Sequence, residues 1–177
     1  MLLNYYRNKA YDIAFDKGFH STFYDERHFI CLIISELMEA VEADRKMSRA
    51  KLERFEAKME PMCSFESRFE TYIKDTLEDE LADACIRIFD LAGEKQIDLD
   101  SEFDKIEVYE ICDYFTRDIF EICKTLTNTD DLKFCLQKAL KQIFEVAKNM
   151  GIKNIEVYIN HKMDYNESRD YLHNKRY

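Results

Sequence analysis

The sequence predicts an all-α fold, because its composition and its residue spacing both favour long helices. Only three glycines and one proline occur among 177 residues, although turn-rich β proteins use both residue types repeatedly. Apolar residues recur with helical spacing, and no segment shows the strict alternation of a strand. With 46% hydrophobic and 35% charged residues, the composition is that of a globular protein. We therefore expect one domain over residues 1–177, a bundle of about five to six helices.

Two helices are expected in the N-terminal third of the chain. The first covers about residues 2–17 and stops at Gly18. The second begins near Asp25 and continues to about residue 59, where Pro61 would break it.

The remaining helices are placed by start and stop signals. Ser67-Arg68-Phe69-Glu70 has the spacing of a capping box, so the third helix is expected to begin there and to end around Gly93. Ser101 resembles another helix start, and Gly151 is a plausible residue just after a helix end. The last three helices are therefore expected at about residues 101–126, 130–150 and 154–171.

Charge and composition exclude several classes of function. The net charge of −10 opposes binding to nucleic acid or to an anionic membrane. No apolar stretch approaches the ~20 residues of a membrane-spanning helix, and the N-terminus lacks the apolar core of a signal peptide. The three glycines lie more than 50 residues apart, so no glycine-rich phosphate loop is present. The six cysteines form no metal-binding pattern. We expect a cytoplasmic protein.

Two pairs of acidic residues stand out on the expected second and third helices. Glu36 and Glu39 form one pair, and Glu80 and Asp83 form the other, each with the three-residue spacing that places both side chains on one helix face. Both pairs border or interrupt apolar rows, where an unpaired ionised carboxylate is costly. If the two helices pack together, four carboxylates converge. Such a cluster selects Mg²⁺, with Mn²⁺ as a possible substitute.

The acidic pairs could instead have a structural role or serve a different chemistry. Arg87 and Lys74 could neutralise part of the charge, which would make the carboxylates structural. A di-iron bundle would need two Glu-x-x-His pairs, and none of the four histidines follows a glutamate by three residues. An HD-type phosphohydrolase would need a His-Asp dipeptide, which is absent.

A weak internal similarity links the helix at 66–93 to the helix at 130–150, at an offset of 55 residues. In this alignment Glu80 corresponds to Cys135, and Asp83 corresponds to Lys138. If the similarity reflects a duplication, the second copy has lost its acids, and each chain carries one site.

Three segments resemble the MazG-like all-α nucleoside triphosphate pyrophosphohydrolases, a superfamily that includes helical dUTPases and dCTP pyrophosphatases. SELMEAVEADRK at residues 35–46 looks like the first acidic signature, and EDELADACIRIFDLAG at residues 78–93 looks like the second. The C-terminal segment at residues 159–177 resembles a Lys-x-x-Tyr-Asn-x-x-Arg ending of one bacterial branch. Together these segments cover under a third of the chain.

The resemblance implies Mg²⁺-dependent cleavage of a nucleoside triphosphate between the α and β phosphates, giving a nucleoside monophosphate and pyrophosphate. It also implies a helical bundle, often a homodimer or a higher homo-oligomer. The metal-ligand and catalytic positions match Glu36, Glu39, Glu80 and Asp83. The residues expected near the nucleotide are Lys162, Asn166 and Arg169, and we add Arg87 to them.

Two departures from the family pattern bear on substrate and assembly. About 40 residues separate the acidic pairs, which is longer than usual, and residues 101–150 look like an added helical pair. Two alternatives to the enzyme therefore stay open. One is a catalytically weak nucleotide-binding regulatory relative, and the other is a helical protein-interaction module with structural carboxylates.

Overall fold

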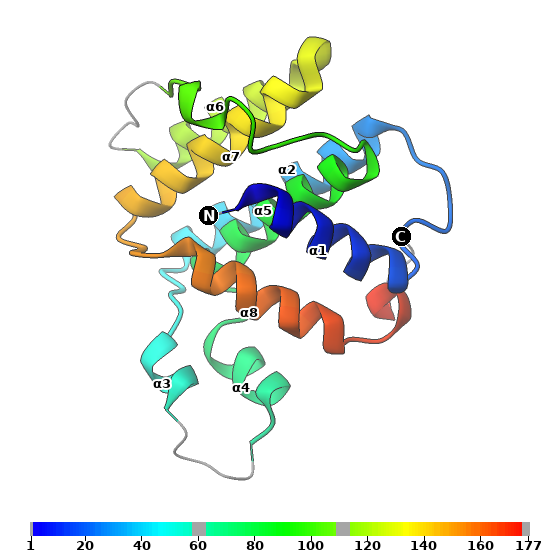
Figure 1. The fold of residues 1–177 in the computed structure, drawn as a ribbon. Coiled ribbons are helices and arrows are strands. Elements are labelled where there is room, and N and C mark those ends of the chain that lie inside the picture. The colour runs from blue at the N-terminus through cyan, green and yellow to red at the C-terminus, as the bar shows by residue number, and fades with distance from the viewer. Residues whose placement is uncertain (1, 58–62, 109–113, 175–177) are drawn as a thin grey trace.

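The computed structural model describes residues 2–57, 63–108 and 114–174, and its regular elements in these ranges are all helices. Three short 3-10 turns accompany the α-helices, at Phe103–Lys105, Thr129–Asp131 and Tyr171–Asn174. The all-α prediction is confirmed for this part of the chain. No helix in these ranges is long and apolar enough to cross a membrane. The α-helices, shown in Figure 1, are α1 (Leu3–Asp16), α2 (Glu26–Arg45), α3 (Leu52–Glu56), α4 (Phe65–Tyr72), α5 (Leu77–Glu94), α6 (Phe115–Thr127), α7 (Leu132–Asn149) and α8 (Ile155–Ser168).

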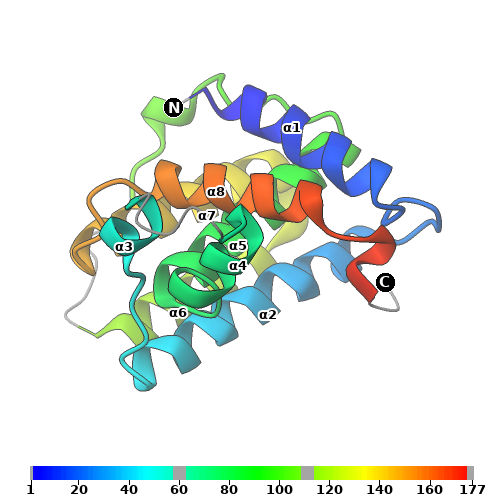
Figure 2. The ribbon, with the colours of Figure 1, turned by 90° about the horizontal axis from the view of Figure 1, so that it is seen from below.

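Helix α5 forms the centre of the molecule. Fourteen of its 18 residues are buried, and α1, α2, α7 and α8 all pack against it. Viewed from below in Figure 2, α5 lies between α8 and α2. An apolar stripe along α5 explains this position, because its five side chains are fully buried: Leu77, Leu81, Ala84, Ile88 and Leu91. Polar residues on α5 are therefore held inside the protein by the packing of their apolar neighbours.

Helices α6 and α7 form a helical pair within the residues 101–150 where the sequence suggested one. They pack against each other, with α6 also on α2 and α7 also on α5. Their contact side chains Ile119, Ile122, Leu136 and Leu140 have no exposed surface, and they belong to the same core as α5. In Figure 1 the pair lies above α8, and α7 also packs against α8.

The expected start of a helix at Ser101 is wrong, since α6 begins at Phe115. Asp98 instead accepts backbone hydrogen bonds from Asp100 and Ser101 and so folds a turn there. Asp100 then accepts the backbone N–H of Leu3 at 2.8 Å, which satisfies the open N-terminus of α1. Part of the segment before α6, residues 109–113, lies outside the described residues.

Helix α2 ends at Arg45, so the expected continuation to residue 59 is also wrong. Met47 adopts a left-handed conformation (φ 54°), and the N–H of Ser48 donates to the carbonyl of Ala43 at 2.9 Å. This pattern closes the helix as a glycine would. The following turn is held by Glu78, which accepts from the N–H of Ala50 at 2.9 Å. The expected break at Pro61 falls outside the described residues.

The single helix expected from Ser67 to Gly93 is divided into α4 and α5. Ser64, rather than Ser67, caps α4. Asp75 then takes a left-handed conformation (φ 59°), and Thr76 caps a new helix by accepting from the N–H of Asp79 at 3.4 Å. Because of this break, Glu78, Asp79 and Glu80 lie in the first turn of α5.

The helix ends at Gly18 and Gly151 are confirmed, and both glycines have positive φ, at +86° and +80°. A side chain at Gly18 would collide with the ring of Tyr171, whereas Gly151 has nothing within 4 Å of an added Cβ. The C-terminal turn is thus packed directly on the end of α1.

We expect Gly18→Ala to destabilise the protein more than Gly151→Ala. Both variants force alanine into left-handed backbone, which costs about 1–2 kcal/mol, but only Gly18→Ala must also displace Tyr171. Thermal unfolding should show melting temperatures lowered by about 2–8 °C for Gly151→Ala and by more for Gly18→Ala. Equal losses in the two variants would contradict the described packing of Tyr171.

Candidate metal centre

Three of the four predicted carboxylates meet between α2 and α5. Glu36 comes from α2, and Glu80 and Asp83 come from α5; one oxygen of each lies within 4.8 Å of the other two. Glu36 and Glu80 are only 7% and 4% exposed. The phase of the apolar rows accounts for this, because Glu36 shares a helix face with Ile33 and Ala40, which have no exposed surface.

The fourth carboxylate, Glu39, is not part of this group. It is exposed on α2, and its closest described polar contact is the hydroxyl of Ser35, which donates to it at 3.5 Å. Three residues along a helix turn the side chain by about 60° from Glu36, so Glu39 points to the solvent edge of the α2–α5 contact. Its charge still raises the pKa values of Glu36 and Glu80, so it lies on the rim of the cluster.

Burial makes the ionised form of these carboxylates unfavourable. Desolvation, followed by the charge of Asp83, raises the pKa of Glu36 to about 7. Desolvation and the charges of Asp79 and Asp83 raise the pKa of Glu80 to about 9. A divalent cation would remove this penalty, because it pairs directly with the carboxylate oxygens. The all-oxygen donor set fits a hard ion such as Mg²⁺.

Two basic side chains compensate only part of the negative charge of these carboxylates. Arg87 lies 3.1 Å from Glu36, and Lys162 lies 2.8 Å from Asp83 and 2.9 Å from Asp79. Lys162, which the resemblance placed near the nucleotide, is 5% exposed and is held inside the carboxylate cluster. Lys74, the other expected counter-charge, instead lies 3.5 Å from Asp75.

Asp79 was missed as a member of the cluster by sequence reasoning. It is 1% exposed, and desolvation raises its pKa to about 6 despite the nearby Lys162. The available signal was its position three residues after Thr76, which marks a helix start. The signal was not used, because one continuous helix was expected from Ser67 to Gly93 and no helix start was expected at Thr76.

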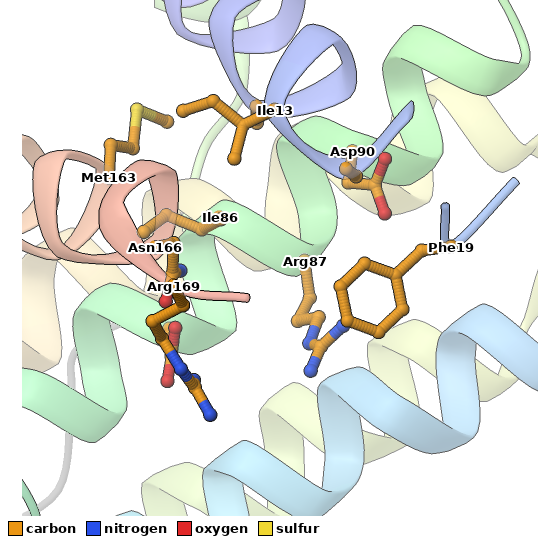
Figure 3. A pocket seen from close by; sticks show the side chains of 11 residues that line it. Ile13, Phe19, Ile86, Arg87, Asp90, Met163, Asn166 and Arg169 are labelled. Atoms are coloured by element: carbon orange, nitrogen blue, oxygen red, sulfur yellow. The ribbon is translucent and has the colours of Figure 1, made fainter. Parts of the chain in front are cut away.

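A pocket shares Asp83 with the carboxylate cluster. Three of the predicted nucleotide-binding residues line it: Arg87, Asn166 and Arg169. Figure 3 shows Arg87, from α5, and Arg169, just after α8, on opposite sides of its opening, with Phe19 beside Arg87. Its volume is about 50 Å³, room for a few water molecules in this conformation. A pocket lined by two arginines and two aspartates thus adjoins the carboxylate cluster.

His20 supports the wall of this pocket. Its Nε2 lies 2.7 Å from the Asp90 carboxylate, which lines the pocket, and its Nδ1 lies 3.2 Å from Glu94. Burial lowers the pKa of His20, but the hydrogen bond to Asp90 and the charges of Asp90 and Glu94 outweigh it, so the pKa is raised. Sequence reasoning gave no role to His20, since its partners lie far along the chain.

Comparisons of this chain with protein-family models, with curated proteins and with solved structures found no match.

Divalent cations should stabilise the protein through Glu80. Its folded-state pKa lies above the ordinary 4.5, so cation-free stability is lost as the pH rises toward about 9. At pH 8 without divalent cations, Glu80→Gln should melt about 2–6 °C higher than the wild type. Adding Mg²⁺ should raise the melting temperature of the wild type and of the surface control Glu53→Gln, but not that of Glu80→Gln. Equal Mg²⁺-induced shifts in all three proteins would disprove a role of Glu80 in cation binding.

The ion pair of His20 should give stability at low pH. Because its folded-state pKa is raised, this contribution is complete below the ordinary pKa of 6.5 and is lost as the pH rises through the folded-state value. Urea unfolding should therefore show a larger loss for His20→Gln at pH 5.5 than at pH 9. His28→Gln is the control with the opposite sign, because burial and the charge of Arg87 lower the pKa of His28. A pH-independent loss in His20→Gln would refute the charged pair.

Proposed function

We propose that this protein is an Mg²⁺-dependent nucleoside triphosphate pyrophosphohydrolase, which converts a nucleoside triphosphate to a nucleoside monophosphate and pyrophosphate. The observation that supports it most is the buried group of Glu36, Glu80 and Asp83, whose oxygens lie within 4.8 Å of one another. The pocket with two arginines that shares Asp83 supplies the second part of a phosphate site.

The residues of the cluster fit a divalent ion. Glu36, Glu80 and Asp83 would hold it, and the rim carboxylate Glu39 lies one helical turn from Glu36. When bound, Mg²⁺ supplies charge neutralisation for phosphate oxygens and lowers the pKa of a coordinated water.

Side chains of the protein would bind the phosphates, stabilise the developing charge and accept the proton. Arg87 and Arg169 border the pocket from opposite sides, and planar guanidinium groups suit the oxygens of a triphosphate. There they would stabilise the charge that develops on the departing pyrophosphate. Glu39, exposed outside the buried group, would accept the proton of the attacking water.

Lys162 has a different role in this proposal from the one that the resemblance implied. Its amine lies between Asp79 and Asp83, so it fixes the orientation of Asp83 rather than binding the nucleotide. Asn166, one helical turn further along α8, faces the pocket and is the residue of this segment that we assign to the nucleotide.

Release of pyrophosphate from a panel of ribo- and deoxyribonucleoside triphosphates with Mg²⁺ tests the proposal. Glu80→Gln should lower the rate by about 10²–10³-fold with unchanged circular dichroism, because charge stabilisation in the transition state is lost. Glu53→Gln, an exposed change on α3, should keep the wild-type rate. Chelation should abolish the reaction, and Mg²⁺, or Mn²⁺ as a substitute, should restore it.

Two different outcomes would each indicate another function. Mg²⁺-dependent nucleotide binding without turnover would indicate the catalytically weak regulatory relative. Neither binding nor turnover would indicate a protein-interaction module with structural carboxylates, an alternative that the ion pairs of Arg87 and Lys162 favour. The homo-oligomer implied by the resemblance is part of the proposal, and light scattering on the purified chain tests it.

A further inference from the structure

The segment after α8 is attached to the end of α1. The amine of Lys17 donates to the backbone carbonyl of Arg169 at 2.6 Å, and the carbonyl of Lys17 accepts from the N–H of Leu172 at 2.8 Å. The ring of Tyr171 packs on Gly18, so closely that a Cβ added there would collide with it. In Figure 1 this C-terminal turn accordingly lies beside the end of α1. Lys17 therefore holds the C-terminal segment with both its side chain and its backbone.

These contacts connect two sides of the pocket. Arg169 lines one side, and Phe19, two residues after Lys17, lines another (Figure 3). Phe19 is placed by the turn that closes α1, in which its N–H donates to the carbonyl of Ala14 at 3.0 Å. Lys17 is the first residue of that turn. The position of Arg169 relative to Phe19 and Arg87 is thus set from the end of α1.

Arg169 needs this support because helix α8 ends before it. The helix stops at Ser168, and the backbone of Arg169 is extended (φ −76°, ψ 158°). Its N–H donates to the carbonyl of Asn166 in a long hydrogen bond of 3.3 Å, and its guanidinium lies 5.6 Å from the centre of the Tyr165 ring. A long side chain meets a ligand in a defined geometry only when the backbone that carries it is fixed. The hydrogen bond from Lys17 supplies that restraint at the carbonyl of Arg169.

A purely structural role is the alternative for Lys17, since lysine side chains commonly bind carbonyls near helix ends. The structure contains a contact of that kind between the same two helices. Lys9 of α1 lies 2.9 Å from Asp164 of α8, and neither residue is among those that line the pocket. Lys17 differs from Lys9 because it binds the backbone of a pocket residue. The Lys9 contact is therefore a matched control for the Lys17 contact.

We propose that Lys17 is a positioning residue for Arg169, which it holds opposite Arg87 so that both guanidinium groups meet the phosphate oxygens of the substrate. The inference rests on the proposed function, because that function identifies the ligand of the pocket as a phosphate chain. Guanidinium groups that are already in place bind such a chain better than mobile ones, since less conformational freedom is lost on binding. Lys17 acts on the substrate only through Arg169, to whose carbonyl its amine donates.

Inorganic tripolyphosphate with Mg²⁺ is a suitable probe, because it carries the phosphate chain without a base or a sugar. Isothermal titration calorimetry measures its affinity for the full chain. Arg169→Ala should weaken binding by about tenfold, because a charged hydrogen bond is lost, and Lys17→Met should weaken it by about three- to tenfold. Lys17→Arg, which can still donate to the carbonyl, should keep most of the affinity. Lys9→Met removes a contact between α1 and α8 away from the pocket and should bind as the wild type does.

A double variant separates positioning from an independent role. If Lys17 acts through Arg169, adding Lys17→Met to Arg169→Ala should cause no further loss of affinity. Losses that multiply in the double variant, or equal losses in Lys17→Met and Lys9→Met, would overturn the inference. A wild type that does not bind tripolyphosphate, or an Arg169→Ala variant that binds it unchanged, would also overturn it, because no phosphate contact would then exist to be positioned.

Tyr171→Ala decides the matter if Lys17→Met does not fold. The Tyr171 side chain is 60% exposed and packs the same segment on Gly18, so its removal should also weaken tripolyphosphate binding, and an unchanged affinity would contradict the inference. Weaker tripolyphosphate binding in Lys17→Met, without pyrophosphate release from any nucleotide by the wild type, would remove the proposed function alone. Pyrophosphate release with the same kcat and KM in the wild type and in Lys17→Met would remove the inference alone.

Discussion

The main constraint on this structure is that several carboxylates lie inside its helical core, where their burial costs stability. Glu36, Asp79, Glu80 and Asp83 gather around the first turns of α5, and the bases in contact with them there are Arg87 and Lys162. Removing charges from water costs several kcal/mol each unless they are paired. The apolar side chains of α5 offset this cost by anchoring the helix on every side. An arrangement that sacrifices stability in this way is characteristic of functional sites.

Interruptions of the helices position these acids. The turn after α2 allows Arg49 and the N–H of Ala50 to bind Glu78, at 2.8 and 2.9 Å. That clamp fixes the start of α5, and the break at Asp75 lets Thr76 cap it. A single long helix through residues 67–93 would lack the Thr76 cap and the hydrogen bond that the N–H of Asp75 donates to Asp79. The local irregularities thus serve the carboxylate cluster.

Whether a feature could be predicted depends on how far apart in the sequence its interacting residues lie. The all-α class, the ends at Gly18 and Gly151, and the meeting of Glu36 with Glu80 and Asp83 were predictable, because they follow from composition, backbone freedom and helical phase. The end of α2 was not, since no glycine or proline marks it and its closing turn depends on the distant Glu78. The partners of Lys162 and His20 lie 83 and 70 residues away, beyond the reach of local patterns.

The last helix supplies a charge that the earlier part of the chain needs. Lys162 of α8 pairs with Asp79 and Asp83, and the carbonyl of Arg169 accepts from Lys17, 152 residues earlier. As the chain leaves the ribosome, α5 therefore emerges well before its own counter-charge. Until α8 has been made and has packed on α5, those carboxylates keep their hydration, because their buried counter-charge is still absent.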